Sequence, residues 1–132
     1  MAYPIVQEIV LPALPERVYR AYMSSSEHEA FTKNGAAKIS QDIGGVFVCH
    51  NGAIAGRNLA LIPGRRIVQA WRSANWPEGT FSIVRLDLEP GPDANTTRLR
   101  MSQDGFPEDQ REHLESGWRA RYWLPLTAYF TR

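Results

Sequence analysis

One pair of neighbouring residues has the types needed for nucleophilic catalysis. Cys49 and His50 adjoin near the middle of the chain, and a thiolate with an imidazole base within hydrogen-bonding reach attacks electrophilic carbon. The preceding residues predict a β-strand, and neighbouring side chains on a strand point to opposite faces. The pattern therefore favours a structural role, with Phe47 and Cys49 turned inward and His50 turned outward.

Other chemistry is not supported by the spacing of the reactive residues. His28, His50 and His113 fall in different predicted elements and lack the short His spacing of a zinc site. The sequence has no nucleophile-elbow, phosphate-loop or dinucleotide motif. Asp42 and Asp87 are expected on solvent-facing positions. The sequence therefore favours a protein without a metal, a cofactor or catalytic residues, and so favours a protein that is not an enzyme.

Two tryptophans in the segment "AWRSANWPEGTFS" (70–82) are the strongest candidates for binding. Trp71 ends a predicted strand, whereas Trp76 stands beside Pro77 at the tip of the hairpin. Trp71 is either a wedge in the core or a wall of a ligand pocket. Trp76 either packs over its own hairpin or contacts a partner protein, together with Pro77.

The composition limits the classes of protein to consider. A chain of 132 residues with 43% hydrophobic content fits one domain, residues 1–132. The formal net charge of +1 gives no attraction to nucleic acid. The sequence has no apparent secretory signal and no apolar run long enough for a membrane span. With Cys49 as the one cysteine, a reducing, cytoplasmic location is the simplest expectation.

The elements that must position these residues follow from the hydrophobic periodicity. Alternation predicts a first strand near residues 5–10, and Pro15 then begins a short helix. Ser26 is the expected N-cap of a second short helix, with Glu29 completing a capping box. Six further strand-like runs follow without helices between them, which predicts an antiparallel sheet.

The pattern changes to a helical period near residue 107 and keeps it to residue 130. Leu114, Trp118 and Tyr122 recur at four-residue steps, and Pro125 predicts a kink between residues 121 and 125. The predicted fold class is therefore α+β, in which a curved antiparallel sheet of about seven strands wraps on a long C-terminal helix.

Alternation along the strands also defines an inner face, which includes two polar residues. Gln69 and Gln103 share this face with apolar neighbours, and a buried amide needs hydrogen-bond partners. Either these amides bond to the backbone or to each other, or they give polarity to a pocket together with the Tyr122 hydroxyl. The other residues expected on this face are Ile67, Trp71, Val84, Leu86, Leu88, Leu99 and Met101.

Four segments together resemble a known superfamily, the START-like or SRPBCC helix-grip proteins. They are "PERVYRAYMSSSEHEAFT", "GGVFVCHNGAIAG", "LIPGRRIVQAWRSANWPEGTFS" and "SGWRARYW". Within the superfamily, the "WR…WPEG" hairpin, the Gly-Gly-x-Phe and the Gly-Trp are similar to the C-terminal domain of activators of the heat-shock-protein-90 ATPase. The eukaryotic co-chaperones have a separate N-terminal domain that supplies much of the chaperone contact, so weak chaperone contact is expected here.

The resemblance implies a cavity between the sheet and the long helix. The first hypothesis is that this cavity binds an apolar or amphipathic small molecule. The second is a chaperone-regulatory or other protein-interaction module that uses Trp76 and Pro77. The third is an enzyme of the cyclase or hydrolase type that uses the cavity. The residues expected to wall the cavity are Phe47, Cys49, Trp71, Met101, Gln103, Trp118 and Tyr122.

Overall fold

The structure is a computed structural model that describes residues 3–131. The strands are β1 (Ile5–Leu11), β2 (Lys38–Ile39), β3 (Val46–Cys49), β4 (Ile54–Ile62), β5 (Arg66–Ser73), β6 (Ser82–Pro90) and β7 (Thr97–Asp104). The helices are α1 (Pro15–Met23), α2 (Ser25–Thr32), α3 (Arg111–Trp118) and α4 (Leu124–Thr131), with 3-10 turns η1 (His50–Gly52) and η2 (Glu108–Gln110) and the π-helical segment η3 (Arg119–Trp123).

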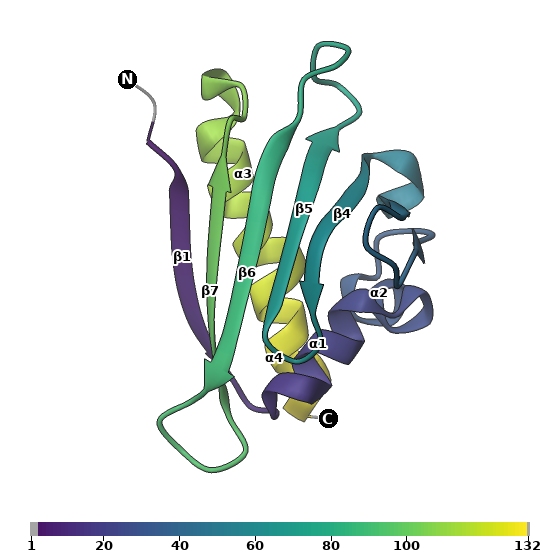
Figure 1. Cartoon of the computed structure of the whole chain (residues 1–132). Helices are drawn as coiled ribbons and strands as arrows, with labels where there is room; N and C mark the ends of the chain where they lie inside the picture. Colours follow the sequence, from purple (N-terminus) through teal and green to yellow (C-terminus); the bar gives the residue numbers. More distant parts are fainter. Residues whose placement is uncertain (1–2, 132) are drawn as a thin grey trace.

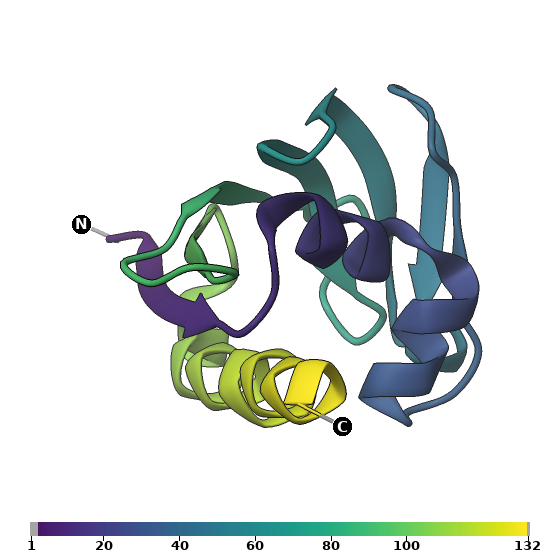
Figure 2. The same cartoon turned by 90° about the horizontal axis from the view of Figure 1, so that it is seen from below.

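The strands form one antiparallel sheet with the order β1-β7-β6-β5-β4-β3-β2. Consecutive strands from β2 to β7 are neighbours, and β1 closes the far edge by pairing with β7 (Figure 1). Viewed from below, the sheet curves around the C-terminal helix, and α1 and α2 lie across the remaining opening (Figure 2). This arrangement confirms the predicted α+β helix-grip fold with seven strands.

The inner face of the sheet follows the predicted alternation. Val84 and Leu86 on β6, and Leu99 and Met101 on β7, are almost completely buried, whereas Arg85 between the first two is exposed. Burial of each such apolar side chain contributes roughly 1.5–3 kcal/mol to folding. The apolar face of the sheet and the apolar stripe of the helix therefore cover each other.

The C-terminal helix runs from α3 through η3 to α4 without a break. Pro125 has no N–H to donate to the carbonyl of Arg121, and the π-helical segment stands directly before the proline. The irregularity expected between residues 121 and 125 therefore takes the form of a π-helical turn. Within that turn, the adjacent residues Tyr122 and Trp123 are both buried.

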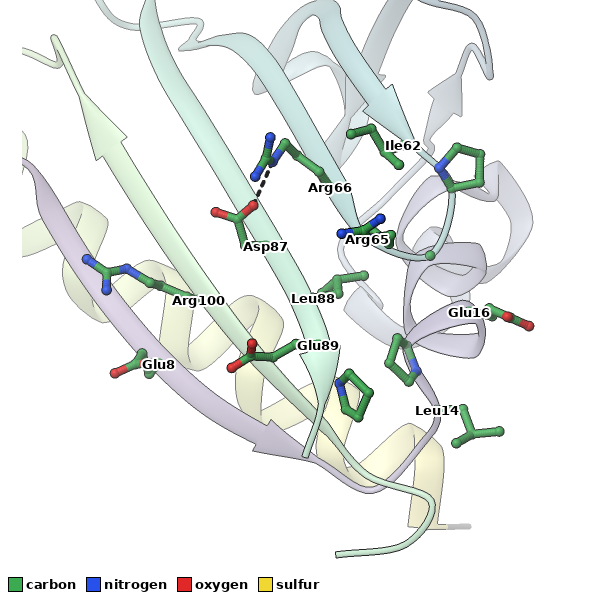
Figure 3. Close-up of a pocket in the computed structure, with 14 residues that line it drawn as sticks. Glu8, Leu14, Glu16, Ile62, Arg65, Arg66, Asp87, Leu88, Glu89 and Arg100 are labelled. Carbon is green, nitrogen blue, oxygen red and sulfur yellow. Dashed lines mark hydrogen bonds and ion pairs between the residues drawn. The ribbon is translucent and has the colours of Figure 1, made fainter. Parts of the chain in front are cut away.

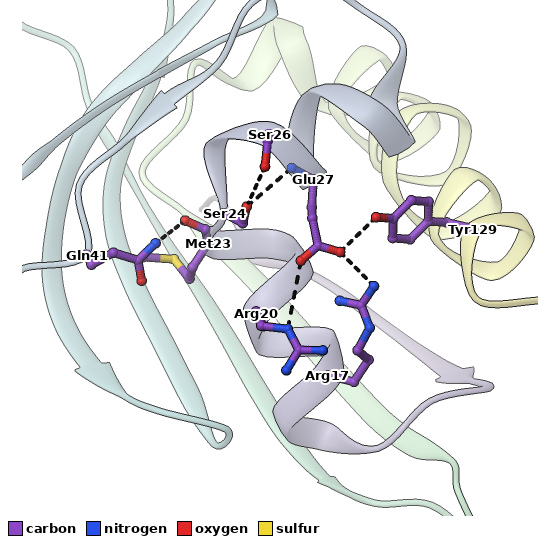
Figure 4. Close-up of polar contacts among 8 residues, drawn as sticks. All are labelled: Arg17, Arg20, Met23, Ser24, Ser26, Glu27, Gln41 and Tyr129. Atoms are coloured by element: carbon purple, nitrogen blue, oxygen red, sulfur yellow. Dashed lines mark hydrogen bonds and ion pairs between the residues drawn. The ribbon is translucent and has the colours of Figure 1, made fainter.

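A carboxylate on α2 fastens the last turns of this helix (Figure 4). Glu27 accepts a hydrogen bond from the Tyr129 hydroxyl at 2.7 Å and pairs with Arg17 of α1 at 2.6 Å. These contacts join three helices at one carboxylate. Burial raises the pKa of Glu27, but the hydrogen bonds from Arg17 and Tyr129, together with the nearby positive charges, outweigh it, so the pKa lies below its usual value.

The start of α2 differs from the prediction. Ser24, not Ser26, is the N-cap, and its Oγ accepts a hydrogen bond from the backbone N–H of Glu27 at 3.3 Å. Ser26 lies inside the first turn, where its hydroxyl contacts that of Ser24. Both serines fit the cap consensus, and α1 ends at Met23, which leaves the earlier serine at the junction.

Gly56 allows β3, β4 and β5 to pack closely. It pairs with Phe47 on β3 and with Trp71 on β5, and a Cβ atom at Gly56 would overlap the Ala70 carbonyl oxygen and lie 2.7 Å from the Phe47 ring. The Ala70 carbonyl is part of the backbone of β5, so it cannot move aside as the end of a flexible side chain could. The strand therefore requires a residue without a side chain at this position.

We expect Gly56→Ala to lower the free energy of unfolding by at least about 2 kcal/mol, because the added methyl group overpacks the core. Urea unfolding followed by tryptophan emission measures this. Gly117→Ala in α3 is the matched control: a Cβ there meets no atom within 4 Å, and replacing a helical glycine stabilises by roughly 0.5–1 kcal/mol. Equal effects of the two changes would contradict the account.

Candidate ligand-binding site

A pocket of about 370 Å³ opens between the sheet and the N-terminal half of the C-terminal helix. Its walls come from η1, the first residue of β4, the end of β5 and the segment α3–η3, the elements whose arrangement Figure 1 shows. This volume lies within the range of small-molecule sites. The lining residues are Asn34, His50, Asn51, Ala53, Ile54, Trp71, Ser73, Trp76, His113, Leu114, Gly117, Trp118, Arg121 and Tyr122.

Four aromatic rings make up much of the pocket wall. Trp71 lies between Trp76 and Trp118, with ring-centroid distances of 5.6 and 5.7 Å. Trp118 in turn contacts Tyr122 at 4.9 Å. Tilted rings at these separations attract each other beyond their burial. The result is a nearly continuous aromatic surface from β5 to the helix.

The exposed aromatic tip considered for Trp76 is not found. The indole is only 4% exposed and packs on Trp71. Arg72 holds this arrangement, because its guanidinium donates to the backbone carbonyls of Trp76 at 2.7 Å and of Pro77 and Thr80 at 3.3 Å. The loop is thereby folded back over the end of β5. Its "WR…WPEG" residues form one packed unit.

The position of Trp118 is fixed by a chain of buried polar groups. Its Nε1 donates to Gln103 Oε1 at 2.8 Å, and Gln103 Nε2 donates to the Ser82 hydroxyl at 3.0 Å. Ser82 then donates to the Trp71 carbonyl at 2.8 Å. Gln103 therefore orients a ring of the pocket but does not border the pocket. Gln69 makes a separate bond to Asn58, at 3.0 Å.

The Tyr122 hydroxyl lies between two buried imidazoles. His28 Nε2 and His50 Nε2 are each 2.9 Å from it. The prediction that His50 turns outward is wrong: His50 is 7% exposed. The strand ends at Cys49, and His50 adopts a left-handed backbone conformation with φ of 54°. Its side chain therefore leaves the strand alternation and turns in toward the helix.

The partners of the two imidazoles fix the direction of every hydrogen bond. His28 Nδ1 must donate to the Tyr22 carbonyl, 2.8 Å away, so a neutral His28 accepts from the Tyr122 hydroxyl through Nε2. His50 Nδ1 accepts from the side-chain amide of Asn34 at 2.9 Å, so His50 Nε2 donates to Tyr122. Every donor and acceptor in this series of hydrogen bonds has a partner when both imidazoles are neutral.

Burial keeps these groups uncharged. Desolvation lowers the pKa of His28 to about 4, and it also lowers that of His50, where the positive charge of Arg121 adds to the effect. Desolvation raises the pKa of Tyr122 well above its usual value and that of the Cys49 thiol to about 12. A protonated thiol, next to an imidazole with both nitrogens engaged, has no activated nucleophile to offer.

The predicted cavity residues fall into two groups. Trp71, Trp118 and Tyr122 line the pocket. Phe47, Cys49, Met101 and Gln103 are buried in the layer behind it.

Eleven of the fourteen lining residues are absent from the predicted cavity wall, and three of these, His50, Gly117 and Arg121, matter most for the site. For two of them the sequence held a signal. Gly117 directly precedes Trp118, and Arg121 directly precedes Tyr122, so each adjoins a predicted wall residue on the helix. For His50 the sequence held no such signal, because strand alternation predicts that its side chain faces outward.

A larger hollow, of about 840 Å³, lies on the opposite face of the sheet beside the start of α1 (Figure 3). Its charges are largely compensated within the molecule. Asp87 accepts from Arg66 at 2.7 Å and from Arg85 at 2.7 Å, and Arg100 stands between Glu8 and Asp87 in the strand register. This surface offers neither an aromatic wall nor a buried polar group.

Between residues 3 and 131, no group of three or more His, Cys, Asp or Glu side chains could hold a metal ion. None of the helices there is long and apolar enough to cross a membrane.

The buried imidazole of His28 should make stability depend on pH. Its folded-state pKa of about 4 is below the ordinary 6.5, so the unfolded chain binds a proton that the folded protein does not. Stability is therefore fully present above about pH 6.5 and is lost as the pH falls toward 4. We expect a loss of about 3 kcal/mol over this window from His28, measured by urea unfolding at a series of pH values.

The matched controls are His28→Gln and His113→Gln. The first should flatten the slope between pH 6.5 and pH 4, whereas the second, at an exposed site, should leave it unchanged. If the His28 variant does not fold, an NMR titration of the wild-type imidazole gives the same information. Protonation of the His28 ring near pH 6.5 in the folded protein would refute the prediction.

Comparisons with known proteins identify the family of this chain. The family model described as "Activator of Hsp90 ATPase homolog 1-like protein" matches residues 12–131. The human protein named "Activator of 90 kDa heat shock protein ATPase homolog 1" is 34% identical over 117 residues, which cover 88% of this chain and 33% of that protein. The Dictyostelium discoideum protein named "Activator of 90 kDa heat shock protein ATPase homolog" is 32% identical over 105 residues, which cover 80% of this chain and 27% of that protein.

Solved structures share the fold of this chain. An Hsp90 activator from Plasmodium falciparum superposes with a TM-score of 0.83 at 19% identity, covering 92% of this chain and 91% of that one. A protein from Chromobacterium violaceum gives a TM-score of 0.80 at 26% identity, covering 100% and 99%. The chain spans about a third of the length of the curated relatives it matches. Because the family model matches nearly the whole of this chain, the chain belongs to the family of activator of Hsp90 ATPase homolog 1-like proteins.

Proposed function

We propose that this protein binds a small amphipathic molecule in the pocket between β5 and the segment α3–η3. The observation that carries the proposal is the aromatic wall of Trp71, Trp76 and Trp118 around an open volume of about 370 Å³. Large aromatic side chains usually fill a core completely. Here the three rings are almost completely buried, yet each also lines the pocket, with polar groups at one side.

The polar side of the pocket suits a ligand with one polar end. Asn51, Ser73, His113 and Arg121 are polar residues of the lining. Asn51 Oδ1 accepts from the Ala36 N–H and Ser73 Oγ donates to Asn75 Oδ1, and both nitrogens of His50 are engaged, whereas Arg121 has no carboxylate partner among the described residues. Sites of this kind bury the apolar body of a ligand and use a few polar groups to orient it. The same engagement of His50 argues against an enzyme that uses this imidazole as a base.

The size of the pocket limits the affinity for a purely apolar ligand. Burying roughly 300 Å² of ligand surface at ~25 cal/mol per Å² contributes about 7 kcal/mol. Association costs several kcal/mol of this. A purely apolar molecule should therefore bind in the micromolar range or more weakly, and polar contacts must supply any further affinity.

Gly117 provides a way to close the pocket without disturbing the fold. It lines the pocket from the last turn of α3, and a Cβ there meets no atom within 4 Å. We expect Gly117→Leu to fold normally, because leucine is a better helix former than glycine. Its side chain should occupy the pocket and weaken binding of the neutral dye N-phenylnaphthylamine at least tenfold, as measured by dye fluorescence.

The matched control is Ser116→Leu, which adds the same side chain to the exposed face of the same helix. This variant should bind the dye like the wild type. Failure of the wild-type protein to bind any of a panel of aromatic dyes would refute the proposal, and so would equal binding by the wild type and Gly117→Leu.

A second candidate function is regulation of a heat-shock-90 chaperone. The observation that favours it is the 34% identity to the human activator over 117 residues. The matched region is only 33% of that protein, so the contacts made by the other two thirds are not supplied by these 132 residues. We propose that this chain makes at most a partial contact with the chaperone.

We expect the 132-residue chain alone to stimulate a purified heat-shock-90 ATPase only weakly, well below tenfold. The measurement is steady-state ATP hydrolysis with increasing amounts of the chain, with a full-length activator as the positive control. Stimulation of tenfold or more would show that this region is sufficient. If Gly117→Leu stimulates the ATPase as much as the wild type does, chaperone regulation does not use the pocket.

A further inference from the structure

The lining of the pocket carries no negative charge. Of the fourteen residues that line it, none is Asp or Glu, and Arg121 is the one with a permanent charge. Two histidines, His50 and His113, complete the titratable nitrogen groups of the lining. A concave, low-dielectric site lined by a single sign of charge concentrates its field on the ligand.

Arg121 is not neutralised within the described part of the chain. No carboxylate between residues 3 and 131 forms an ion pair with it, whereas Arg17, Arg66, Arg85 and Arg111 are all paired. The sequence explains this difference. The residues three and four positions away along the helix are Gly117, Trp118, Leu124 and Pro125, and none of these can offer a carboxylate at helical spacing.

The charge of Arg121 also acts on the interior of the site. It is exposed at the mouth, yet it contributes to the lowered pKa of His50, at the inner end of the pocket. The π-helical turn places Arg121 directly before Tyr122, which points inward between the imidazoles. A guanidinium at the rim thus stands next to a wall of aromatic rings.

We infer that the pocket selects planar aromatic anions, such as aromatic carboxylates or sulfonates, with the ring against Trp71 and Trp118 and the acid group at Arg121. This inference rests on the proposed function and names its class of ligand. A guanidinium presents a fork of donors that matches a carboxylate or sulfonate. Aromatic faces favour a flat ring over a flexible chain of the same area.

The test uses two dyes with the same aromatic body. Anilinonaphthalene sulfonate carries an acid group, and N-phenylnaphthylamine is its neutral counterpart. Kd is measured by fluorescence for both dyes on the wild type, Arg121→Gln, Arg121→Lys and Arg119→Gln. Arg119 is the matched control, because it is also an exposed arginine of the π-helical turn but does not line this pocket.

We expect Arg121→Gln to weaken the sulfonate at least fivefold while changing Kd of the neutral dye less than twofold. Arg121→Lys should restore part of the loss, and Arg119→Gln should change neither Kd. High sodium chloride should weaken the sulfonate on the wild type but not on Arg121→Gln. Gly117→Leu should weaken both dyes, which places both signals in the pocket.

The outcomes separate this inference from the proposed function. If the neutral dye binds in the pocket but Arg121→Gln leaves the sulfonate unaffected, the anion inference is wrong and the ligand pocket stands. If Arg119→Gln and Arg121→Gln weaken the sulfonate equally, the attraction comes from the general charge of the helix, and the inference is again wrong. If neither dye binds, both proposals fail together.

Discussion

The hydroxyl of Tyr122 is the point on which the rest of the structure depends. It joins three segments that are far apart in the sequence, since His28 comes from α2, His50 from the turn after β3, and Tyr122 from the C-terminal helix. Burying three such groups without partners would cost several kcal/mol. They are stable together only when the helix lies at one depth and one rotation against the sheet, so this chain of hydrogen bonds sets the helix position.

The helix held in this way packs unevenly along its length. Its C-terminal half is fastened at Tyr122 and again at Tyr129 by Glu27. Its N-terminal half presents Gly117 toward the sheet, where no side chain fills the space. A glycine inside a helix lowers its stability relative to alanine, and here it coincides with the pocket. The opening is thus a consequence of one small residue on a helix whose depth is fixed elsewhere.

Much of the fold could be predicted from the sequence, because strand alternation and helical spacing report burial directly. The inner-face positions of Leu86 and Met101 follow from the two-residue period. The site was less accessible to this reasoning. His50 turns inward because the chain leaves the strand through a left-handed residue, a backbone feature that alternation does not encode. Trp76 is buried because Arg72 folds the loop back over Trp71, and that depends on tertiary contacts.

The residues that mark the family in the sequence are also those that build the aromatic end of the molecule. In "WR…WPEG", Trp71 is a wall of the pocket, Arg72 holds the loop carbonyls, and Trp76 completes the stack. Packing alone is therefore a sufficient reason for these residue types at these positions. Resemblance at these positions does not distinguish a ligand pocket from a chaperone contact. Arg121 is different, because the fold gives it no carboxylate partner within the described chain and leaves its guanidinium exposed at the mouth of the pocket, where it is accessible to a ligand.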